Sequence, residues 1–279
     1  MAAVIPGEPD LARLIRSASQ APRRHLAVPG TLNFRDVGGY PVAGGGEIRW
    51  RTLLRSDGLH RLGPGASEML AGLQLRTVLD LRTAGEAGLA PGPADTLARL
   101  GAQTLQVSLI GDDLTGADLI GDDGEGLPPD LGQIYDYIID RRGGQIGAAI
   151  SALARPGGLP ALVHCSAGKD RTGIVVGLAL AAVGVPDQVV AADYALSRRY
   201  LDPQRTPVIG QLSRSTGLGE ERVTALLACS PELMLGVLGR ARHLGGSVRG
   251  DLAGHGVSDG DLAALPAALV TGGGPDGPR

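Results

Sequence analysis

The chain has 279 residues, of which 43 % are hydrophobic and 20 % are charged, a composition typical of a globular protein with a buried core. Its formal net charge of -3 argues against a general binder of polyanions, since contact with a nucleic-acid backbone needs a broad excess of Lys and Arg. We therefore expect no nucleic-acid partner, and recognition of an anion would have to be local.

Signals for membrane insertion and for export are missing from the sequence. No run of about 18 or more apolar residues occurs, so we expect no integral membrane segment. Residues 1–20 lack the basic start, apolar centre and cleavage site of a standard secretory signal. Cys165 and Cys229 are too few for a disulfide framework, which favours a reducing compartment. The sequence predicts a cytoplasmic protein, and unconventional secretion stays open.

The first quarter of the chain predicts a peripheral start, a hairpin and a helix. Residues 1–27 are interpreted as an N-terminal extension. Two extended stretches at 33–40 and 47–54 flank a Gly-rich turn, which is typical of a β-hairpin. A helix is expected over 66–73, after a Gly-Pro-Gly start signal.

The rest of the chain contains short apolar runs and several helical patterns. We expect strands at 75–81, 104–110 and 159–163, and an acidic, Gly-rich loop at 111–129. We expect helices at 83–89, 131–141, 145–154, 172–183, 186–199, 220–228, 231–244 and 259–269.

These elements predict an α/β fold, with a central, mainly parallel sheet flanked by helices and an N-terminal hairpin. No internal repeat and no interdomain linker are visible in the sequence. We therefore predict one domain over residues 28–270, followed by a disordered tail at 271–279.

The most informative segment is the run His-Cys-Ser-Ala-Gly-Lys-Asp-Arg-Thr-Gly at 164–173. It lies between a predicted strand and a predicted helix, where open α/β sheets bind ligands. Successive backbone N–H groups can curl there around a tetrahedral anion, next to the positive end of the helix. The residues expected to bind phosphate are Ser166, Ala167, Gly168, Lys169, Asp170 and Arg171.

Cys165 and Arg171 are the candidate catalytic residues of this loop. Positive surroundings favour the thiolate of Cys165, which can attack phosphorus in line and form a phosphocysteine that water then hydrolyses. The planar guanidinium of Arg171 can bind two phosphate oxygens. We expect His164 to orient the loop through its ring N–H, and the Thr172 hydroxyl to donate to the Cys165 sulfur and help it leave.

The leaving oxygen needs a proton, and two aspartates compete for the role of general acid. Asp80 ends the predicted strand at 75–81, and it would lie at the same sheet edge as Cys165 if the two strands are neighbours. Asp170 lies inside the loop itself. Helix capping or pairing with Arg82 explains Asp80 equally well, so the choice between the two aspartates stays open.

Lys169 is the only lysine among the 26 basic residues of the chain. Lys and Arg are not interchangeable at a phosphate site. We therefore interpret the retention of lysine at this position as functional.

The run at 164–173 resembles the active-site signature of the protein tyrosine phosphatase superfamily. Its longer form is similar to the atypical bacterial branch that includes mycobacterial secreted and listerial lipid-acting phosphatases, and the segments at 33–40, 51–62 and 80–83 support that branch. The resemblance implies hydrolysis of phosphotyrosine, with phosphoserine, phosphothreonine or phosphoinositides as further substrates. It implies no metal or other cofactor, and a helical lid over residues 109–156.

Three alternatives remain open at this stage. The main role could be that of a phosphoinositide phosphatase, because lysine in the loop is shared with such enzymes. A rhodanese-like sulfurtransferase also carries a cysteine in an anion-binding loop, but it would not require Arg171 in this register. A phospho-binding module without activity is the third alternative, and intact Cys165 and Arg171 argue against it. The sequence makes no prediction of oligomeric state.

Overall fold

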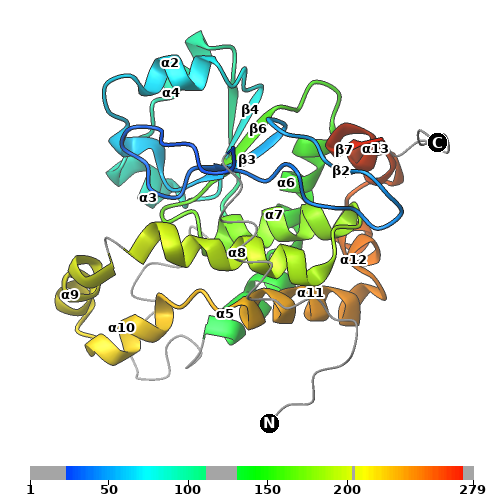
Figure 1. Ribbon diagram of the computed structural model, residues 1–279. Coiled ribbons are helices and arrows are strands. Elements are labelled where there is room, and N and C mark those ends of the chain that lie inside the picture. Colours follow the sequence, from blue (N-terminus) through cyan, green and yellow to red (C-terminus); the bar gives the residue numbers. More distant parts are fainter. Residues whose placement is uncertain (1–22, 111–130, 203–204, 273–279) are drawn as a thin grey trace.

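A five-stranded sheet forms the centre of the computed structural model, which describes residues 23–110, 131–202 and 205–272 (Figure 1). The strand order is β1-β3-β6-β4-β5. The strands are β1 (Arg35–Asp36), β3 (Leu53–Ser56), β4 (Thr77–Asp80), β5 (Gln103–Gln106) and β6 (Ala161–His164). All neighbours are parallel except β1 and β3. The predicted α/β fold with a mainly parallel sheet is confirmed.

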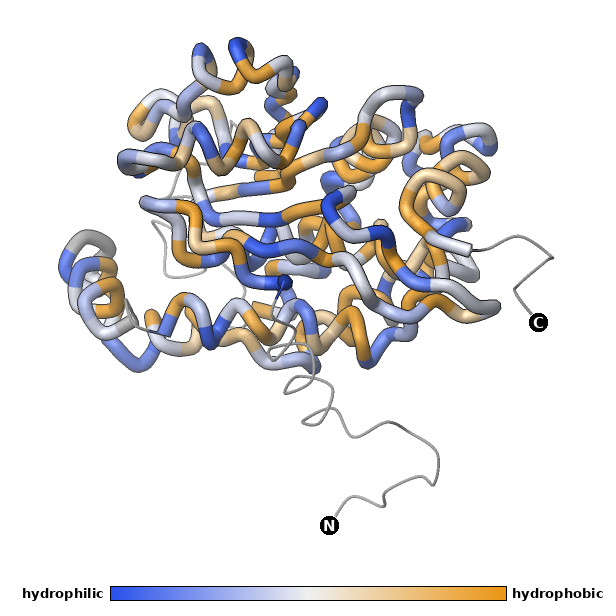
Figure 2. Tube along the Cα trace, turned by 45° about the horizontal axis from the view of Figure 1, so that its top comes forward, coloured by the Kyte–Doolittle hydropathy of each residue, from blue (hydrophilic) through white to orange (hydrophobic). Residues whose placement is uncertain are grey.

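Neighbouring side chains of the central strands point into two separate hydrophobic cores. Leu54 and Leu162 pack on one face of the sheet, whereas Leu53 and Val163 pack on the other. Helices α2 (Ala66–Ala71) and α4 (Ala94–Arg99) contribute to the first core, and α6 (Gly143–Ala154) and α7 (Asp170–Ala182) contribute to the second. Figure 2 shows hydrophobic and hydrophilic residues alternating along the outer helices, as expected for helices with one face turned inward.

The remaining helices surround this sheet on the side of α7 or lie at its rim (Figure 1). They are η1 (Leu59–Arg61), α3 (Ala84–Leu89), α5 (Leu131–Arg141), α8 (Asp187–Leu201), α9 (Arg205–Thr216), α10 (Glu220–Leu226), α11 (Pro231–Gly245), α12 (Val248–Gly254) and α13 (Asp259–Leu269). Local sequence patterns predict most of them within a few residues, but no helix was predicted at α4, α9 or α12.

The predicted hairpin strand at 47–54 is wrong in one respect, because it consists of two strands in different sheets. β2 (Glu47–Ile48) pairs with β7 (Val270–Thr271) at the other end of the chain. Arg51 interrupts the stretch with a φ of 61°, in the left-handed region, and its N–H donates to Asp36. The chain resumes as β3, which pairs with β1.

The predicted lid and the predicted start of the C-terminal tail also differ from the structure. Helices α5 and α6 bury Ile138, Ile139 and Ile150 in the main core, so the prediction of a lid is not confirmed for the helical part of 109–156. The predicted acidic loop lies outside the described residues. Thr271, predicted to open the disordered tail, pairs with Glu47, so the ordered domain extends further than expected.

The described helices contain at most 15 residues each. None of them is by itself long and apolar enough to cross a membrane. Among the described helices, only α10 and α11 taken together have the length and composition of a membrane span, and a bend of 54° separates them.

Candidate active site

The strand register brings the candidate site residues to one edge of the sheet. Ser56 and Asp80 both lie beside His164 at the carboxyl ends of β3, β4 and β6. Cys165 follows directly and is 2 % exposed. The sheet therefore places Asp80 and the predicted nucleophile at the same edge, as the sequence analysis expected for neighbouring strands.

Close packing of the loop after Cys165 requires a glycine at its centre. Gly168 has a φ of 65°, and a Cβ atom at this position would lie 2.2 Å from the carbonyl oxygen of Ser56. A larger residue would move the loop away from β3.

The carbonyl groups of residues 166–169 all meet donors that pack around the outside of the loop. They accept hydrogen bonds from the Gly58 N–H, the Asn33 amide and the Arg55 guanidinium, at 2.9 to 3.3 Å. In a planar trans peptide the next N–H points in the opposite direction. The N–H groups of residues 167–170 are therefore directed to the concave side, where they can bind an anion.

A buried ionic cluster of Asn33, Arg35, Arg55 and Asp193 supports the loop from below. The Asp193 carboxylate accepts from Arg55 Nη1 at 2.7 Å and from Arg35 Nε at 3.2 Å, and all four residues are almost fully buried. Burial alone would raise the pKa of Asp193, but the charges of Arg35 and Arg55 outweigh it and hold that pKa well below its ordinary value. The cluster is therefore ionised and holds the loop carbonyls in place.

Glu86 holds the side chain of Arg171 at the loop. Its carboxylate accepts from Arg171 Nη2 at 2.8 Å and Nη1 at 2.5 Å, and from Ser166 Oγ at 2.7 Å. Burial raises the pKa of Glu86, but these contacts outweigh it and lower the pKa to about 2. The same carboxylate caps α3 by accepting from the Thr83 N–H.

Glu86 was not identified as a site residue from the sequence. Thr83 followed three residues later by Glu86 is a capping-box pattern, which could have placed the carboxylate at the start of α3. Its second partner, Arg171, is 85 residues away in the sequence, and no local pattern indicates that contact.

Asp80 is engaged by its own neighbour along the chain. Arg82 donates to both oxygens of Asp80, with Nε–Oδ1 2.9 Å and Nη2–Oδ2 2.6 Å. Burial raises the pKa of Asp80, but the hydrogen bonds from Arg82 and the nearby His164 outweigh it and keep that pKa below its ordinary value. The pairing with Arg82 considered from the sequence is thus present.

His164 contacts the backbone of the loop. Its Nδ1 lies 3.2 Å from the Cys165 carbonyl oxygen, which can only accept, so Nδ1 carries the proton. Burial lowers the pKa of His164, which favours the neutral ring. The geometry is that of a ring N–H orienting the start of the loop.

The second candidate acid, Asp170, begins α7 between two hydrogen-bond donors. Lys169 Nζ lies 3.1 Å from Asp170 Oδ1, and the Tyr135 hydroxyl donates to the same oxygen. Burial, and then the charge of Asp170, raise the pKa of Tyr135 well above its ordinary value, so this hydroxyl keeps its proton. Tyr135 also lies 2.7 Å from the Tyr194 hydroxyl. Tyr135 was not identified from the sequence.

Thr172 is fully buried in the first turn of α7. Its hydroxyl has no hydrogen-bond partner within the part of the chain that the structure describes. Its role as a donor to the Cys165 sulfur stays a prediction.

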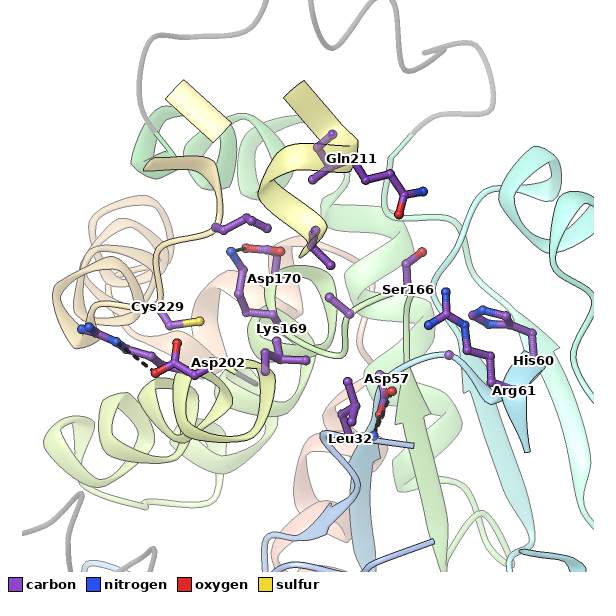
Figure 3. A pocket seen from close by; sticks show the side chains of 17 residues that line it. Leu32, Asp57, His60, Arg61, Ser166, Lys169, Asp170, Asp202, Gln211 and Cys229 are labelled. Atoms are coloured by element: carbon purple, nitrogen blue, oxygen red, sulfur yellow. Dashed lines mark hydrogen bonds and ion pairs between the residues drawn. The ribbon is translucent and has the colours of Figure 1, made fainter. Parts of the chain in front are cut away.

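A pocket of about 420 Å³ opens beside the loop (Figure 3). Lys169 and Asp170 lie together on one side, and His60 and Arg61 come from the opposite side. Much of the remaining lining is apolar, and it includes Leu32, Leu201, Val208, Leu212 and Leu227. Cys165, Arg171 and Asp80 do not line this pocket. The volume suits a small ligand with an apolar body.

The chemistry of this site points to an anion. The donors around the loop are backbone N–H groups and the Arg171 guanidinium, which together suit a tetrahedral phosphate. Within residues 23–110, 131–202 and 205–272, no group of three or more His, Cys, Asp or Glu side chains could hold a metal ion.

Comparison with known proteins gives the same assignment. The model of the tyrosine phosphatase family matches residues 26–271. The triple specificity protein phosphatase PtpB of Mycobacterium tuberculosis is 30 % identical over 87 % of this chain and 98 % of its own length. A tyrosine-protein phosphatase of Nostoc commune is 34 % identical over 54 % of this chain and 50 % of its own length. The chain is a cysteine-based phosphatase and belongs to the tyrosine phosphatase family.

Proposed function

We propose that the protein hydrolyses phosphotyrosine and, at the same site, phosphoserine, phosphothreonine or phosphoinositides, through a phosphocysteine on Cys165. The observation that supports this most is the loop itself, in which the carbonyls of residues 166–169 turn outward and Glu86 holds Arg171 beside the concave face. The similar PtpB carries the name of a triple specificity phosphatase, which supports a broad substrate range.

The reaction divides into two displacements at phosphorus. The Cys165 thiolate forms the S–P bond while the P–O ester bond breaks, and the leaving oxygen takes a proton from the general acid. The loop N–H groups and Arg171 stabilise the charge on the equatorial oxygens. Water then attacks phosphorus and gives a proton to the carboxylate that acted as the acid in the first step, the S–P bond breaks, and phosphate and the Cys165 thiolate are released.

We propose Asp170 as the general acid. It lies within the loop itself, five residues after Cys165, whereas both oxygens of Asp80 are bound by Arg82. Tyr135 and Lys169 fix the Asp170 carboxylate at the loop. Asp80 then serves the site indirectly, since its Oδ1 lies 3.9 Å from His164 Nδ1.

The mechanism is tested with Cys165→Ser and Arg171→Lys on a panel of phosphotyrosine, phosphoserine and phosphoinositide substrates. We expect Cys165→Ser to lose activity on every substrate and to trap no phosphate after acid quenching. Arg171→Lys should lose at least about a hundredfold in kcat/KM, because the ammonium cannot form the two-point contact. Cys229→Ser is the matched control and should still form the acid-trapped phosphocysteine. Near-normal turnover by Cys165→Ser would refute the mechanism.

The proton donor is tested by comparing Asp170→Asn with Asp80→Asn. An aryl leaving group needs little protonation, whereas an alkyl leaving group needs much more. Asp170→Asn should therefore lose more activity on an alkyl phosphate than on p-nitrophenyl phosphate, and Asp80→Asn should affect both alike. The reverse pattern would assign the proton to Asp80.

A further inference from the structure

The ammonium group of Lys169 has all of its donors occupied. Nζ lies 3.0 Å from the carbonyl oxygen of Leu226, 2.9 Å from that of Ala228 and 3.1 Å from Asp170 Oδ1. A lysine ammonium has three N–H donors. Lys169 is only 2 % exposed, so these three acceptors account for its whole hydrogen-bonding capacity in a buried position.

Two of these acceptors lie at the end of α10. Leu226 is the last residue of that helix, and Ala228 follows two residues later. Carbonyl groups at a helix C-terminus lack partners within the helix and carry partial negative charge, so a cation stabilises them. Lys169 therefore joins the phosphate-binding loop to a segment 57 and 59 residues further along the chain.

The segment held by Lys169 forms one wall of the pocket. Helices α9 and α10 make a helical hairpin, here called the α9–α10 hairpin (residues 205–226), which lies at the edge of the molecule (Figure 1). Val208, Gln211 and Leu212 of α9 line the pocket, as does Leu227 just after α10 (Figure 3). Among its described side chains only Val223 is buried, so the hairpin contributes little to the core.

We propose that Lys169 is a positioning residue that fixes the α9–α10 hairpin against the phosphate-binding loop and thereby sets a preference for phosphate monoesters with an extended apolar body. The proposal rests on the proposed phosphatase function for its substrate and on the Lys169 contacts for its structure. The phosphate would bind the loop, and the apolar body would lie against Leu201, Val208 and Leu212.

The competing role for Lys169 is direct recognition of a second phosphate on the substrate. That role would require the ammonium to leave the Leu226 and Ala228 carbonyls, and both would lose their charged partner. The two roles differ in the substrates they affect. A positioning role weakens binding of a large monophosphate, whereas phosphate recognition affects only substrates that carry a second phosphate.

The experiment uses the full chain with Lys169→Met and Lys169→Arg. Steady-state kinetics are measured on p-nitrophenyl phosphate, on biphenyl-4-yl phosphate and on the matched biphenyl-4,4′-diyl bisphosphate. Hydrogen exchange of residues 205–228 is followed in parallel, because it does not depend on activity. Glu221→Gln, on the exposed side of α10, is the matched control.

We expect Lys169→Met to raise KM for both biphenyl esters by about tenfold more than for p-nitrophenyl phosphate, with the larger change in KM rather than in kcat. Exchange in residues 205–228 should become faster, Lys169→Arg should restore part of both effects, and Glu221→Gln should change neither. If Lys169→Met does not fold, Lys169→Gln takes its place. The neutral amide removes the charge and one of the three donors, so a smaller change of the same kind is then expected.

Unchanged exchange in the hairpin, with a KM loss confined to the bisphosphate, would overturn the proposal and assign Lys169 to phosphate recognition. If the wild-type protein hydrolyses none of the three esters, the proposed function fails on that result alone. The exchange measurement would still decide whether Lys169 holds the hairpin.

Discussion

The two sides of the phosphate-binding loop are held in different ways. Below the loop, the ionic cluster of Asn33, Arg35, Arg55 and Asp193 is buried, and its Arg55 guanidinium and Asn33 amide donate hydrogen bonds to the loop carbonyls. Beside the pocket, the Lys169 ammonium joins the loop to the end of the α9–α10 hairpin, in which Val223 is the one buried side chain among those described. The loop thus combines a buried support for its phosphate-binding face with a more exposed wall around the rest of the substrate, and we expect that wall to be held less strongly.

The largest effect is expected from Asp193→Asn in the ionic cluster. Removal of this carboxylate leaves Arg35 and Arg55 buried without their negative partner, which typically costs about 3–5 kcal/mol of folding free energy. Urea denaturation at neutral pH measures this loss. Asp187→Asn on the same helix is the control, because its pair with Arg242 is partly exposed and should contribute at most about 1 kcal/mol. Equal losses in the two variants would contradict the comparison.

The pH dependence of the folding free energy is a second test of the ionic cluster. The pKa of Asp193 in the folded protein is below its ordinary value of 3.8, so the carboxylate binds protons more readily in the unfolded chain. Its contribution is therefore fully present above that ordinary value and is lost as pH falls below it. The stability difference between the wild type and Asp193→Asn should shrink in that acidic range. A constant difference down to strong acid would argue against an ionic role.

Glu86→Gln should have the next largest effect, on catalysis. The amide keeps the shape of the side chain but removes the charge that holds Arg171, so we expect kcat/KM to fall by about 10- to 100-fold, or roughly 1.4–2.7 kcal/mol. The pKa of Glu86 is lowered from 4.5 to about 2, so its ionic contact is complete above pH 4.5 and is lost as pH falls through about 2. The defect should thus persist over the whole neutral range. Glu68→Gln, on the exposed side of α2, should retain wild-type kinetics.

The residues of the phosphate-binding loop could be predicted from the sequence, whereas the residues that hold the loop in place could not. The reason is that the latter lie far from the loop in the sequence. The strand, Cys165, Arg171 and the following helix lie in one contiguous run, so local patterns placed them together. Glu86, which binds Arg171, lies 85 residues before it in the sequence. Asp193, which binds Arg55 beneath the loop, lies in the middle of α8. Hydrophobic periodicity in the sequence does not indicate contacts of this kind. A charged residue within the buried stretch of α8 could have identified Asp193 as a partner for a buried arginine.

The same reasoning explains the corrected elements. The predicted strand at 47–54 has suitable residues throughout, but β2 depends on β7, more than 200 residues away, and Arg51 turns the chain between β2 and β3. The helices of the predicted lid were placed correctly along the chain, and only their packing in the core was missed. Local sequence propensity therefore identified the helices and strands. Their pairing and packing partners are set by tertiary contacts, which local propensity does not contain.

The smallest effect is expected from Val223→Ala, which tests how weakly the α9–α10 hairpin is held. Val223 is 2 % exposed, and loss of its methyl groups should destabilise the hairpin by about 1–2 kcal/mol. Hydrogen exchange in residues 205–226 should become about 5- to 30-fold faster, with little change in the midpoint of global unfolding. Val248→Ala on α12, which packs in the main core, should show the opposite pattern of lower global stability and unchanged exchange in the hairpin. If Val223→Ala instead lowers global stability as much as Val248→Ala does, the hairpin unfolds together with the core, and the distinction between a buried support and a separately held wall is wrong.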